Sequence, residues 1–516
     1  MTYYITTPLF YVNDLPHIGS AYPTIACDFF AGHMLQRGEE VAFLTGTDEH
    51  GQKIEKAAKE ANKTPIEHCD YITDEFQKLW EILGINYDYF VRTSNQAHYK
   101  FVTEFFKKVQ ANGDIYKGKY TGLYCSHCED FWLEKDLVKD GKKLLCPTHK
   151  KPVEEYQQEN YFFALTKYQD RLEQYINDNP DFISPDYRKN EVMGWIKDGL
   201  RDFPISRANL DWGIPIEGSD QVTYVWFDAL LGYISGLGAD KEKYWNQDSK
   251  VVHIIGKDIL RFHAVYWPAM LMSAGYPLPY RVFGHGFLTK DGMKMGKTLG
   301  NIIDPVALSE KYGAEALRFY LLRDIVFGRD GDYTNEGFIE RLNSDLANNL
   351  GNLLNRALKL INKYNDGIIP ELTSDQNFDS LHQQFLEEIN NLNPYFALEA
   401  VFKMLDAVNV EINVVEPWRA LKTEPDNEAA LLSLIDALNA CKVAAIYLAP
   451  LIPQLSKQIF INLGIYQASD LDKLDRKDLL QNYLGFEQIN KSIAGIKVLE
   501  EPVGIFQRLE KAPVAA

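Results

Sequence analysis

Strand-like and helix-like patterns alternate in the first fifty residues, and this alternation limits the possible folds more than any other feature of the sequence. Tyr3–Thr6 is aromatic and β-branched, which is typical of a short strand. Apolar residues between Ile18 and Phe30 recur at helical spacing. Val41–Thr45 is a continuous apolar run, as expected of a strand buried on both faces of a parallel sheet. This order predicts the start of a doubly wound, parallel α/β domain.

The same pattern returns later in the chain. Val251–Ile255 and Arg281–Phe283 are strand-like, and apolar residues at helical spacing lie between them. We therefore expect a Rossmann-type sheet assembled from both regions. Its first helix should begin at His17–Ser20, with Pro23 in the first turn, because proline has no N–H to donate within a helix.

From about residue 340 onward, the sequence is helical throughout. Helices are expected over 342–361, 381–389, 397–410 and 431–448, and proline-containing turns separate several of them. Such a series fits an antiparallel α-helical bundle. Residues 116–222 fit neither pattern, because they are rich in charge, tyrosine, glycine and proline, so we interpret them as an insertion into the α/β domain.

Composition narrows the class of protein. The 516 residues carry a net charge of −18, which argues against a general nucleic-acid binder but permits one local basic surface. The apolar stretch Val443–Pro453 is too short to span a membrane. The N-terminus lacks the features of a signal peptide, and six cysteines in so long a chain are no disulfide scaffold. A cytoplasmic protein is the expectation.

Four of the potential metal ligands have informative spacing. Cys125 and Cys128 form one CxxC corner, and Cys146 and His149 form a second after seventeen intervening residues. Three thiolates and one imidazole make a closed tetrahedral set for a structural Zn²⁺. His127 is a competing ligand, and reduced cysteines without metal are the alternative.

Two short motifs suggest phosphate binding. His17-Ile18-Gly19-Ser20 lies where a loop enters a helix, so its amides and imidazole can face an anion. Lys294-Met295-Gly296-Lys297-Thr298 carries two ammonium groups in a turn that could grip a polyphosphate. Each signal alone is weak, since a histidine before a helix is usually a cap and a basic turn is usually solvated.

Together the two motifs resemble the HIGH and KMSKS signatures of class I aminoacyl-tRNA synthetases. Further segments resemble the methionyl-tRNA synthetase family, and the resemblance runs from about residue 3 to residue 465. These segments are Pro8–Gly19 (PLFYVNDLPHIG), Thr45–Gly51 (TGTDEHG), Tyr224–Ala229 (YVWFDA), Ile255–Ile259 (IGKDI), Phe262–His263 and Trp267–Met270 (WPAM).

The chain departs from the family pattern at a few positions. Ser20 replaces the last histidine of HIGH, and it can donate a hydrogen bond but carries no positive charge. Gly296 and Thr298 replace two serines of KMSKS, while both lysines remain. Leu230 stands where relatives commonly have proline, which could shift the wall of the amino-acid pocket.

The resemblance implies an activity and a domain order. Enzymes of the family activate L-methionine with ATP, which Mg²⁺ accompanies, to give methionyl-adenylate and pyrophosphate. They then transfer methionine to the 3′ end of tRNA(Met). The implied domains are 1–115 and 223–287 for the two halves of the catalytic domain, 116–222 for a connective insertion with the zinc knuckle, 288–340 for a stem-contact region with the KMSKS-like loop, 341–505 for an anticodon-binding bundle and 506–516 for a tail.

The resemblance also assigns site residues. His17, Ser20, Lys294 and Lys297 are implied as catalytic, and His17, Gly19, Ser20, Gly256, Asp258 and Lys297 as ATP-binding. The implied methionine site comprises Leu9, Tyr11, Asp48, Trp226, Ala229, Tyr233, Ile259, His263 and Trp267, with Asp48 receiving the substrate ammonium. Asn352, Arg356 and Trp418 are implied to bind the anticodon. Without the resemblance, core packing would be the preferred interpretation of the tryptophans and Tyr233.

Two rival functions remain open at this point. One is another class I synthetase or a related nucleotidyltransferase, although enzymes for leucine, isoleucine and valine need a much larger insertion. The other is a synthetase-like binding protein without catalysis, which only Ser20 supports. Because nothing after residue 505 is long enough to fold as the dimerising domain of some relatives, we expect a monomer.

Overall fold

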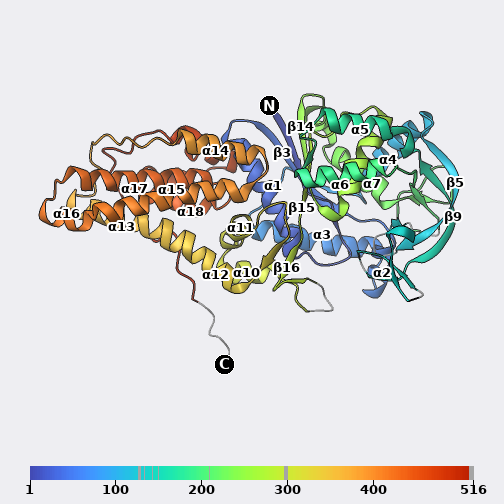
Figure 1. Ribbon diagram of the computed structural model, residues 1–516, viewed down its shortest axis with the longest axis horizontal. Coiled ribbons are helices and arrows are strands. Elements are labelled where there is room, and N and C mark those ends of the chain that lie inside the picture. The colour runs from blue at the N-terminus through green and yellow to red at the C-terminus, as the bar shows by residue number, and fades with distance from the viewer. Residues whose placement is uncertain are drawn as a thin grey trace.

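A computed structural model gives the fold of this chain. It describes residues 1–125, 130–132, 134–141, 143–148, 150–208, 210–295 and 300–510. An α/β domain and a bundle of long helices lie end to end along the longest axis of the molecule, as Figure 1 shows. The first helix, α1, runs where the two meet.

The central sheet is parallel throughout. Strand β1 (Thr2–Thr6) lies in its middle, between β14 (Ser249–Gly256) and β3 (Glu40–Asp48). The strand order is β10-β15-β14-β1-β3-β2, and β4 also pairs with β3. The remaining strands are β2 (Phe10–Tyr11), β4 (Tyr89–Arg92), β10 (Ile183–Ser184) and β15 (Arg281–His285). The strands predicted near residues 3, 41, 251 and 281 are therefore confirmed.

The order of the strands marks one place at the carboxyl-end edge of the parallel sheet, called the crevice, where that order changes direction. From β1 the chain continues to β3 on one side, whereas β14 and β15 arrive later on the other side. In doubly wound sheets, ligands bind where the strand order changes direction, beyond the carboxyl ends of the strands. Here that point lies between β1 and β14.

Helix α1 (Ile18–Gln36) begins where the sequence predicts, but Pro23 does not lie in its first turn. Pro23 is the sixth helical residue, so the expectation for this proline is wrong. The helix is buried along nearly its whole length, from Ile18 to Gln36. Packing on all sides then stabilises a helix that one missing backbone hydrogen bond would otherwise weaken.

Helices cover the sheet on both faces. They are α2 (Gln52–Glu60), α3 (Pro65–Ile82), α4 (Gln96–Ala111), α7 (Val225–Ser235), α8 (Lys241–Tyr244) and α9 (Trp267–Ala274). A π-helical turn, Phe262–Tyr266, leads directly into α9. The expected helix between the later two strands is thus present.

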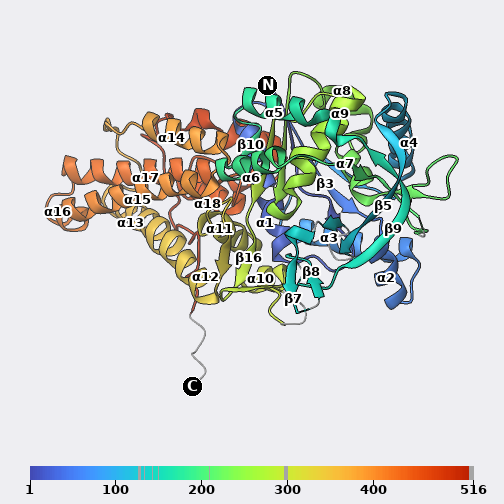
Figure 2. The same cartoon turned by 45° about the vertical axis from the view of Figure 1, so that its right-hand side comes forward.

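The predicted insertion contains an antiparallel sheet. Its long strands β5 (Ile115–Cys125) and β9 (Glu154–Phe163) pair along their length, with β6 (Asp130–Trp132) and β11 (Phe203–Pro204) at the edges. Figure 2 shows β5 and β9 curving along the side of the molecule away from the helical bundle. Between β6 and β9 in the chain, β7 (Val138–Asp140) and β8 (Lys143–Leu145) pair as a small antiparallel hairpin.

The second part of the same segment belongs to the central sheet. Helices α5 (Gln169–Asp178) and α6 (Asp186–Lys197) flank β10, and β10 pairs in parallel with β15. Within the predicted insertion 116–222, the residues of β10 thus form part of the central parallel sheet. The predicted domain limits stay predictions.

A small sheet and two helices connect the domains. Strand β16 (Leu288–Lys290) pairs with β17 (Met293–Lys294) and with β18 (Gly331–Tyr333). Helices α10 (Pro305–Tyr312) and α11 (Ala314–Arg323) follow β17 in the chain. The short strands β12 (Ser206–Arg207) and β13 (Val222–Thr223) pair separately.

The predicted helical region forms a bundle. Its main helices are α12 (Asn335–Leu342), α13 (Asn352–Tyr364), α14 (Asp379–Asn390), α15 (Pro394–Val415), α16 (Pro417–Thr423), α17 (Glu428–Leu448) and α18 (Pro453–Asn462). A π-helical segment, Asn343–Gly351, joins α12 to α13. By length and hydropathy α17 could cross a membrane, but 83% of its most apolar window is buried inside the protein.

A buried ion cluster ties the bundle to the sheet domain. The carboxylate of Asp28 on α1 lies 2.6 Å from Nη2 of Arg318 and 2.8 Å from Nη1 of Arg476. Arg318 also donates to the backbone oxygen atoms of Pro450 and Leu451 at the end of α17. Any movement of α1 away from the bundle would separate these charges and leave one of them buried without a partner, which is costly. The ion cluster therefore holds α1, the helix that His17 caps, against the bundle.

Burial of His33 on α1 makes stability depend on pH. His33 is fully buried with its ring centroid 4.4 Å from that of Phe29, and burial lowers its pKa from 6.5 to about 3. As pH falls below about 6.5, His33 is therefore protonated in the unfolded chain but stays neutral in the folded chain, so the free energy of unfolding decreases. Between pH 7 and pH 5 this loss is about 2 kcal/mol.

We expect His33→Leu to remove that part of the acid sensitivity. Urea unfolding of the wild type and the variant at pH 7 and pH 5 measures it, and the variant should lose about 2 kcal/mol less on acidification. An identical pH dependence in both proteins would show that His33 is not excluded from protonation in the fold.

Candidate active site

His17 caps α1 at the mouth of the crevice. Its Nδ1 atom accepts a hydrogen bond from the backbone N–H of Gly19 at 3.0 Å. Burial lowers the pKa of His17, so the ring is neutral near pH 7. Because Nδ1 is the acceptor, the ring proton is on Nε2. His17 thus offers one fixed N–H donor at the positive end of a helix, which is the arrangement that an oxyanion needs.

Gly19 and Ser20 complete the first turn. A Cβ atom on residue 19 would lie 2.7 Å from Cε1 of His17, so only glycine leaves the imidazole in this position. Ser20 is buried, and its backbone N–H donates to the carbonyl oxygen of His17 at 2.8 Å. The short side chains at both positions let His17 turn back over its own helix.

The segment after the lysine motif reaches the same place. The backbone N–H of Ile18 donates to the carbonyl oxygen of Ile303 at 3.3 Å. Lys294 ends β17, and Lys297 lies in 296–299, outside the described residues. The contact between Ile18 and Ile303 therefore brings the chain six residues after Lys297 beside the histidine motif.

A hydrogen-bonded pair of rings lies on the β14 side of the crevice. The hydroxyl of Tyr233 is 2.8 Å from Nε2 of His263, and Nδ1 of His263 is 3.0 Å from the carbonyl oxygen of Ile259. Because a carbonyl only accepts, Nδ1 carries the ring proton and Tyr233 donates to Nε2. Burial lowers the pKa of His263 to about 4, so the ring is neutral.

A tyrosine hydroxyl or a histidine N–H can donate weakly to a thioether sulfur, but both protons of this pair are already directed at protein acceptors. A thioether would therefore meet these rings through aromatic contacts with its polarizable sulfur rather than through a donated proton.

Aromatic rings extend the wall around this pair. The indole of Trp226 stacks on Phe262 with a centroid distance of 4.0 Å and an interplanar angle of 8°. Ala229 is buried one turn later on α7. Trp267 is fully buried behind the wall, where its Nε1–H donates to Nε2 of His253 at 3.2 Å. Of the two tryptophans, Trp267 thus supports the wall from inside the core.

The opposite wall follows β3. Asp48 ends this strand, is 4% exposed and pairs in register with Tyr11 of β2. The charge of Asp48 contributes to raising the pKa of Tyr233, although burial is the larger cause. The Leu9 side chain packs against α7, where Cδ1 would lie 2.6 Å from a Cβ atom added to Gly232. One carboxylate therefore faces an otherwise aromatic and aliphatic site.

Gly256 and Asp258 lie at the carboxyl end of β14. Asp258 is exposed, and its Oδ1 atom would be 2.5 Å from a Cβ atom on residue 256, so glycine permits the carboxylate to fold back over the strand end. A carboxylate at this point of a doubly wound sheet can accept hydrogen bonds from ribose hydroxyls.

A second cluster forms in the bundle, away from the sheet. The guanidinium of Arg356 on α13 lies 5.2 Å from the ring centroid of Trp418 on α16. Its Nη1 and Nη2 atoms donate to the amide oxygens of Asn413 at 3.0 Å and Asn409 at 3.3 Å. Asn352 is exposed at the start of α13, one turn before Arg356.

Two of the four predicted zinc ligands can be placed. Cys125 and Cys146 are both fully buried, Cys125 at the end of β5 and Cys146 directly after β8. Cys125 is opposite Asp130 in the hairpin of β5 and β6, and the turn after Cys146 is closed by a 2.8 Å bond from Lys150 N–H to its carbonyl. Cys128 and His149 fall outside the described residues. Two buried soft thiols fit a zinc knuckle in their chemistry.

Sequence reasoning missed the polar network that supports the β3 wall. Glu49 is fully buried, and its Oε1 atom accepts from Arg92 Nε at 2.7 Å and from Thr73 at 2.9 Å. Asp228 is also buried, with its Oδ2 atom 3.2 Å from Nδ1 of His50. Asp228 lies inside the apolar run Val225–Leu231 and Arg92 directly follows Phe90 and Val91, and a charge in or beside an apolar run was the available signal.

Comparison with known proteins identifies the family. Residues 3–358 match the model of the family described as tRNA synthetases class I (M). The chain is 44% identical to the chloroplastic/mitochondrial methionine–tRNA ligase of Arabidopsis thaliana, over 99% of this chain and 84% of that protein. It is 46% identical to the methionine–tRNA ligase of a Nostoc species, over 90% of each chain.

A solved structure agrees along the whole chain. The structure of Mycobacterium tuberculosis methionyl-tRNA synthetase in complex with methionyl-adenylate aligns with a TM-score of 0.90 and 37% identity, covering 98% of this chain and 100% of that one. The fold of both the sheet domain and the helical bundle is thus shared. The chain belongs to the family of class I tRNA synthetases of the methionine type.

Proposed function

We propose that this protein is a methionine–tRNA ligase, which activates L-methionine with ATP and transfers it to tRNA(Met). The observation that carries the proposal is the crevice at β1 and β14. It joins a neutral histidine donor at a helix N-terminus to a largely apolar site with one carboxylate. The likeness to methionine–tRNA ligases over nearly the whole chain supports the same function.

In the first step, a carboxylate oxygen of methionine attacks the α-phosphorus of ATP. The bond between the α-phosphorus and the oxygen bridging to the β-phosphate breaks, and pyrophosphate leaves. Negative charge grows on the phosphate oxygens, and the Nε2–H of His17 is held ready to stabilise it without reorganisation. Ser20 would assist at the same phosphates, and Lys297, with Lys294, would hold the β- and γ-phosphates.

The amino-acid site would select methionine by shape and polarizability. Asp48 would bind the ammonium group, and Leu9 and Tyr11 would cover the same side. Trp226, Ala229, Tyr233, Ile259, His263 and Trp267 would form or support the aromatic wall for the thioether. Leucine and isoleucine have different branching and no sulfur, so they gain less from these rings.

In the second step, a hydroxyl of the 3′-terminal adenosine of tRNA attacks the methionyl carbonyl carbon. A new ester bond forms, and AMP leaves as the bond to phosphate breaks. Asn352, Arg356 and Trp418 would read the anticodon, because an indole with a guanidinium beside it suits stacking of an unpaired base. On a chain of net charge −18, attraction to tRNA has to come from a local patch, so tRNA binding should be strongly salt-dependent.

Replacing Trp418 should separate the two steps. In Trp418→Ala, we expect KM for tRNA to rise about 5- to 100-fold, since stacking on an aromatic ring contributes 1–3 kcal/mol. Methionine-dependent pyrophosphate exchange without tRNA should change less than about twofold, because α16 lies far along the bundle from the crevice (Figure 1). Aminoacylation and exchange assays on one preparation measure both.

Phe396→Ala is a matched control for this variant, because Phe396 is another partly exposed aromatic residue of the bundle, 43% exposed. It should leave both assays unchanged. Damage to exchange as well as to charging in Trp418→Ala would instead mark the tryptophan as a structural residue.

Two metal ions belong to the proposal. Mg²⁺ would accompany ATP, whose phosphates it neutralises. Cys125, Cys128, Cys146 and His149 would hold one structural Zn²⁺, which would stabilise the turns of the insertion when bound. The monomeric state and the cytoplasmic location stay predictions.

Pyrophosphate exchange across the twenty amino acids tests the function. Methionine should give the highest kcat/KM by a wide margin. A different best amino acid would favour another class I synthetase. Binding of tRNA without any adenylate formation would favour the non-catalytic alternative.

A further inference from the structure

A negative charge is buried behind the aromatic wall, between two histidines. The Asp228 side chain has no exposed surface, and its Oδ2 atom lies 3.2 Å from Nδ1 of His50. Nε2 of His98 on α4 lies 3.8 Å from Oδ1. Both histidine side chains are only 1% exposed. A carboxylate in such a place is costly unless cationic or hydrogen-bonding partners compensate it.

The two partners of this contact come from opposite walls of the site. Asp228 precedes Ala229 on α7, the helix that also carries Trp226 and Tyr233. His50 follows β3, two residues after Asp48. The contact is thus a direct link between the helix with the aromatic wall and the segment that carries Asp48.

His50 connects the contact with Asp228 to Tyr11. The backbone carbonyl of His50 accepts a hydrogen bond from the Tyr11 hydroxyl at 2.8 Å. On its other edge, Nε2 of His50 is 2.9 Å from the hydroxyl of Tyr99. His50 also lies against Trp212, with 5.5 Å between ring centroids. The imidazole that contacts Asp228 and the carbonyl that accepts from Tyr11 belong to one residue, so a displacement of His50 would shift Tyr11 and, two residues earlier in the chain, Asp48.

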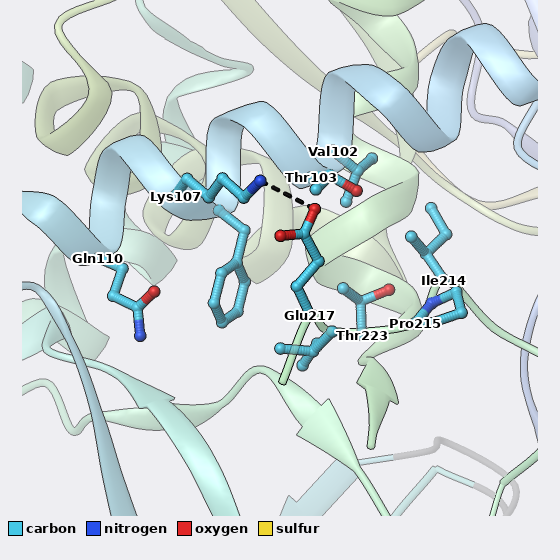
Figure 3. A pocket seen from close by; sticks show the side chains of 10 residues that line it. Val102, Thr103, Lys107, Gln110, Ile214, Pro215, Glu217 and Thr223 are labelled. Carbon is cyan, nitrogen blue, oxygen red and sulfur yellow. Dashed lines mark hydrogen bonds and ion pairs between the residues drawn. The ribbon is translucent and has the colours of Figure 1, made fainter. Parts of the chain in front are cut away.

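Packing on the far side of Asp228 is incomplete. Thr223 donates from Oγ1 to Oδ2 of Asp228 at 3.3 Å, and Thr223 also lines a pocket of about 150 Å³. Figure 3 shows this pocket between α4 and residues 214–223, with the ion pair of Lys107 and Glu217 beside it. Because a cavity lies next to Thr223, close packing alone does not fix this segment, and polar contacts to Asp228 contribute to holding it.

We propose that Asp228 is a positioning residue for amino-acid recognition, whose carboxylate fixes His50 and so sets Asp48 and Tyr11 at the correct distance from the aromatic wall. The proposal rests on the proposed function, since it concerns the same methionine site. Asp228 touches neither the phosphates nor the reacting carboxylate in this scheme. Its loss should therefore affect the binding of methionine rather than the chemical step.

Asp228→Asn tests this directly, because asparagine keeps the shape and removes the charge. We expect KM for methionine to rise about 10- to 100-fold, with KM for ATP and kcat of pyrophosphate exchange within about twofold. Calorimetric titration of methionine should show the same loss of affinity without ATP. The double variant with His50→Gln should be no worse than the more affected single variant, because both changes remove one link.

Asp114→Asn is the matched control. Asp114 is also a buried carboxylate, with Ser273 at 2.7 Å and Lys167 at 3.0 Å, but it lies outside both walls of the site. It should lower the melting temperature and leave KM for methionine unchanged. If Asp228→Asn does not fold, His50→Gln alone should show the rise in KM.

Several results would overturn the proposal. One is an unchanged KM for methionine in folded Asp228→Asn, or in His50→Gln if only that variant folds. Another is a loss in kcat without a rise in KM. A third is that Asp228→Asn behaves like Asp114→Asn, with a lower melting temperature and an unchanged KM. An absence of methionine-dependent exchange in the wild type would instead contradict the proposed function. The two failures are therefore distinguishable from the same set of assays.

Discussion

Replacing His17 with alanine is expected to lower kcat for methionine-dependent pyrophosphate exchange by about 100- to 1,000-fold. In the proposed mechanism, the Nε2–H of His17 would face charge that develops only as the α-phosphorus is attacked, so the substrates themselves should bind nearly as before. KM for methionine should stay within about twofold. Steady-state exchange kinetics at varied methionine and ATP give both values.

A second substitution separates catalysis from helix capping. His17 accepts from the N–H of Gly19, so alanine also removes a cap from α1. Asparagine is among the best capping residues but is too short to place a donor where Nε2 lies. His17→Asn should therefore restore thermal stability and remain slow. Recovery of the rate in His17→Asn would show that capping was the main contribution.

Replacing Asp48 with asparagine is expected to raise KM for methionine by about 100-fold or more, with little change in KM for ATP. Asp48 is nearly buried at the end of β3, in a site that is otherwise aromatic and aliphatic. An ammonium group that enters this site without a counter-charge loses its hydration and gains too little in return.

An analogue without the ammonium group makes the test specific. The wild type should bind desamino-methionine far more weakly than methionine, whereas Asp48→Asn should discriminate little between the two. Competitive inhibition of exchange by the analogue measures this. Equal discrimination by both proteins would place the ammonium group away from Asp48.

Much of the fold follows from the spacing of apolar residues. Continuous apolar runs such as Val41–Thr45 predicted buried parallel strands, and β3 and β14 flank β1 on its two sides in the parallel sheet. Long helical periodicity predicted the bundle helices, whose cores are correspondingly apolar. Pro23 was placed wrongly because a rule for isolated helices does not include the packing that surrounds α1 on all sides.

The candidate site was less predictable than the fold. Resemblance named Tyr233 and His263, but not that their protons already have acceptors within the protein. Strand β10 has only two residues, too few for a periodic signal, yet it joins the central sheet. Asp228 and His50 are 178 positions apart in the sequence, and only the fold brings Oδ2 of Asp228 to 3.2 Å from Nδ1 of His50. Contacts of this kind depend on tertiary structure, which periodicity does not encode.

A crystal structure with a non-hydrolysable methionyl-adenylate analogue tests the central claim most directly. We expect the phosphate within hydrogen-bond distance of Nε2 of His17, the ammonium group at Asp48 and the thioether against Trp226 and Tyr233. An analogue that binds elsewhere, or in the crevice with its side chain turned away from these rings, would contradict the account.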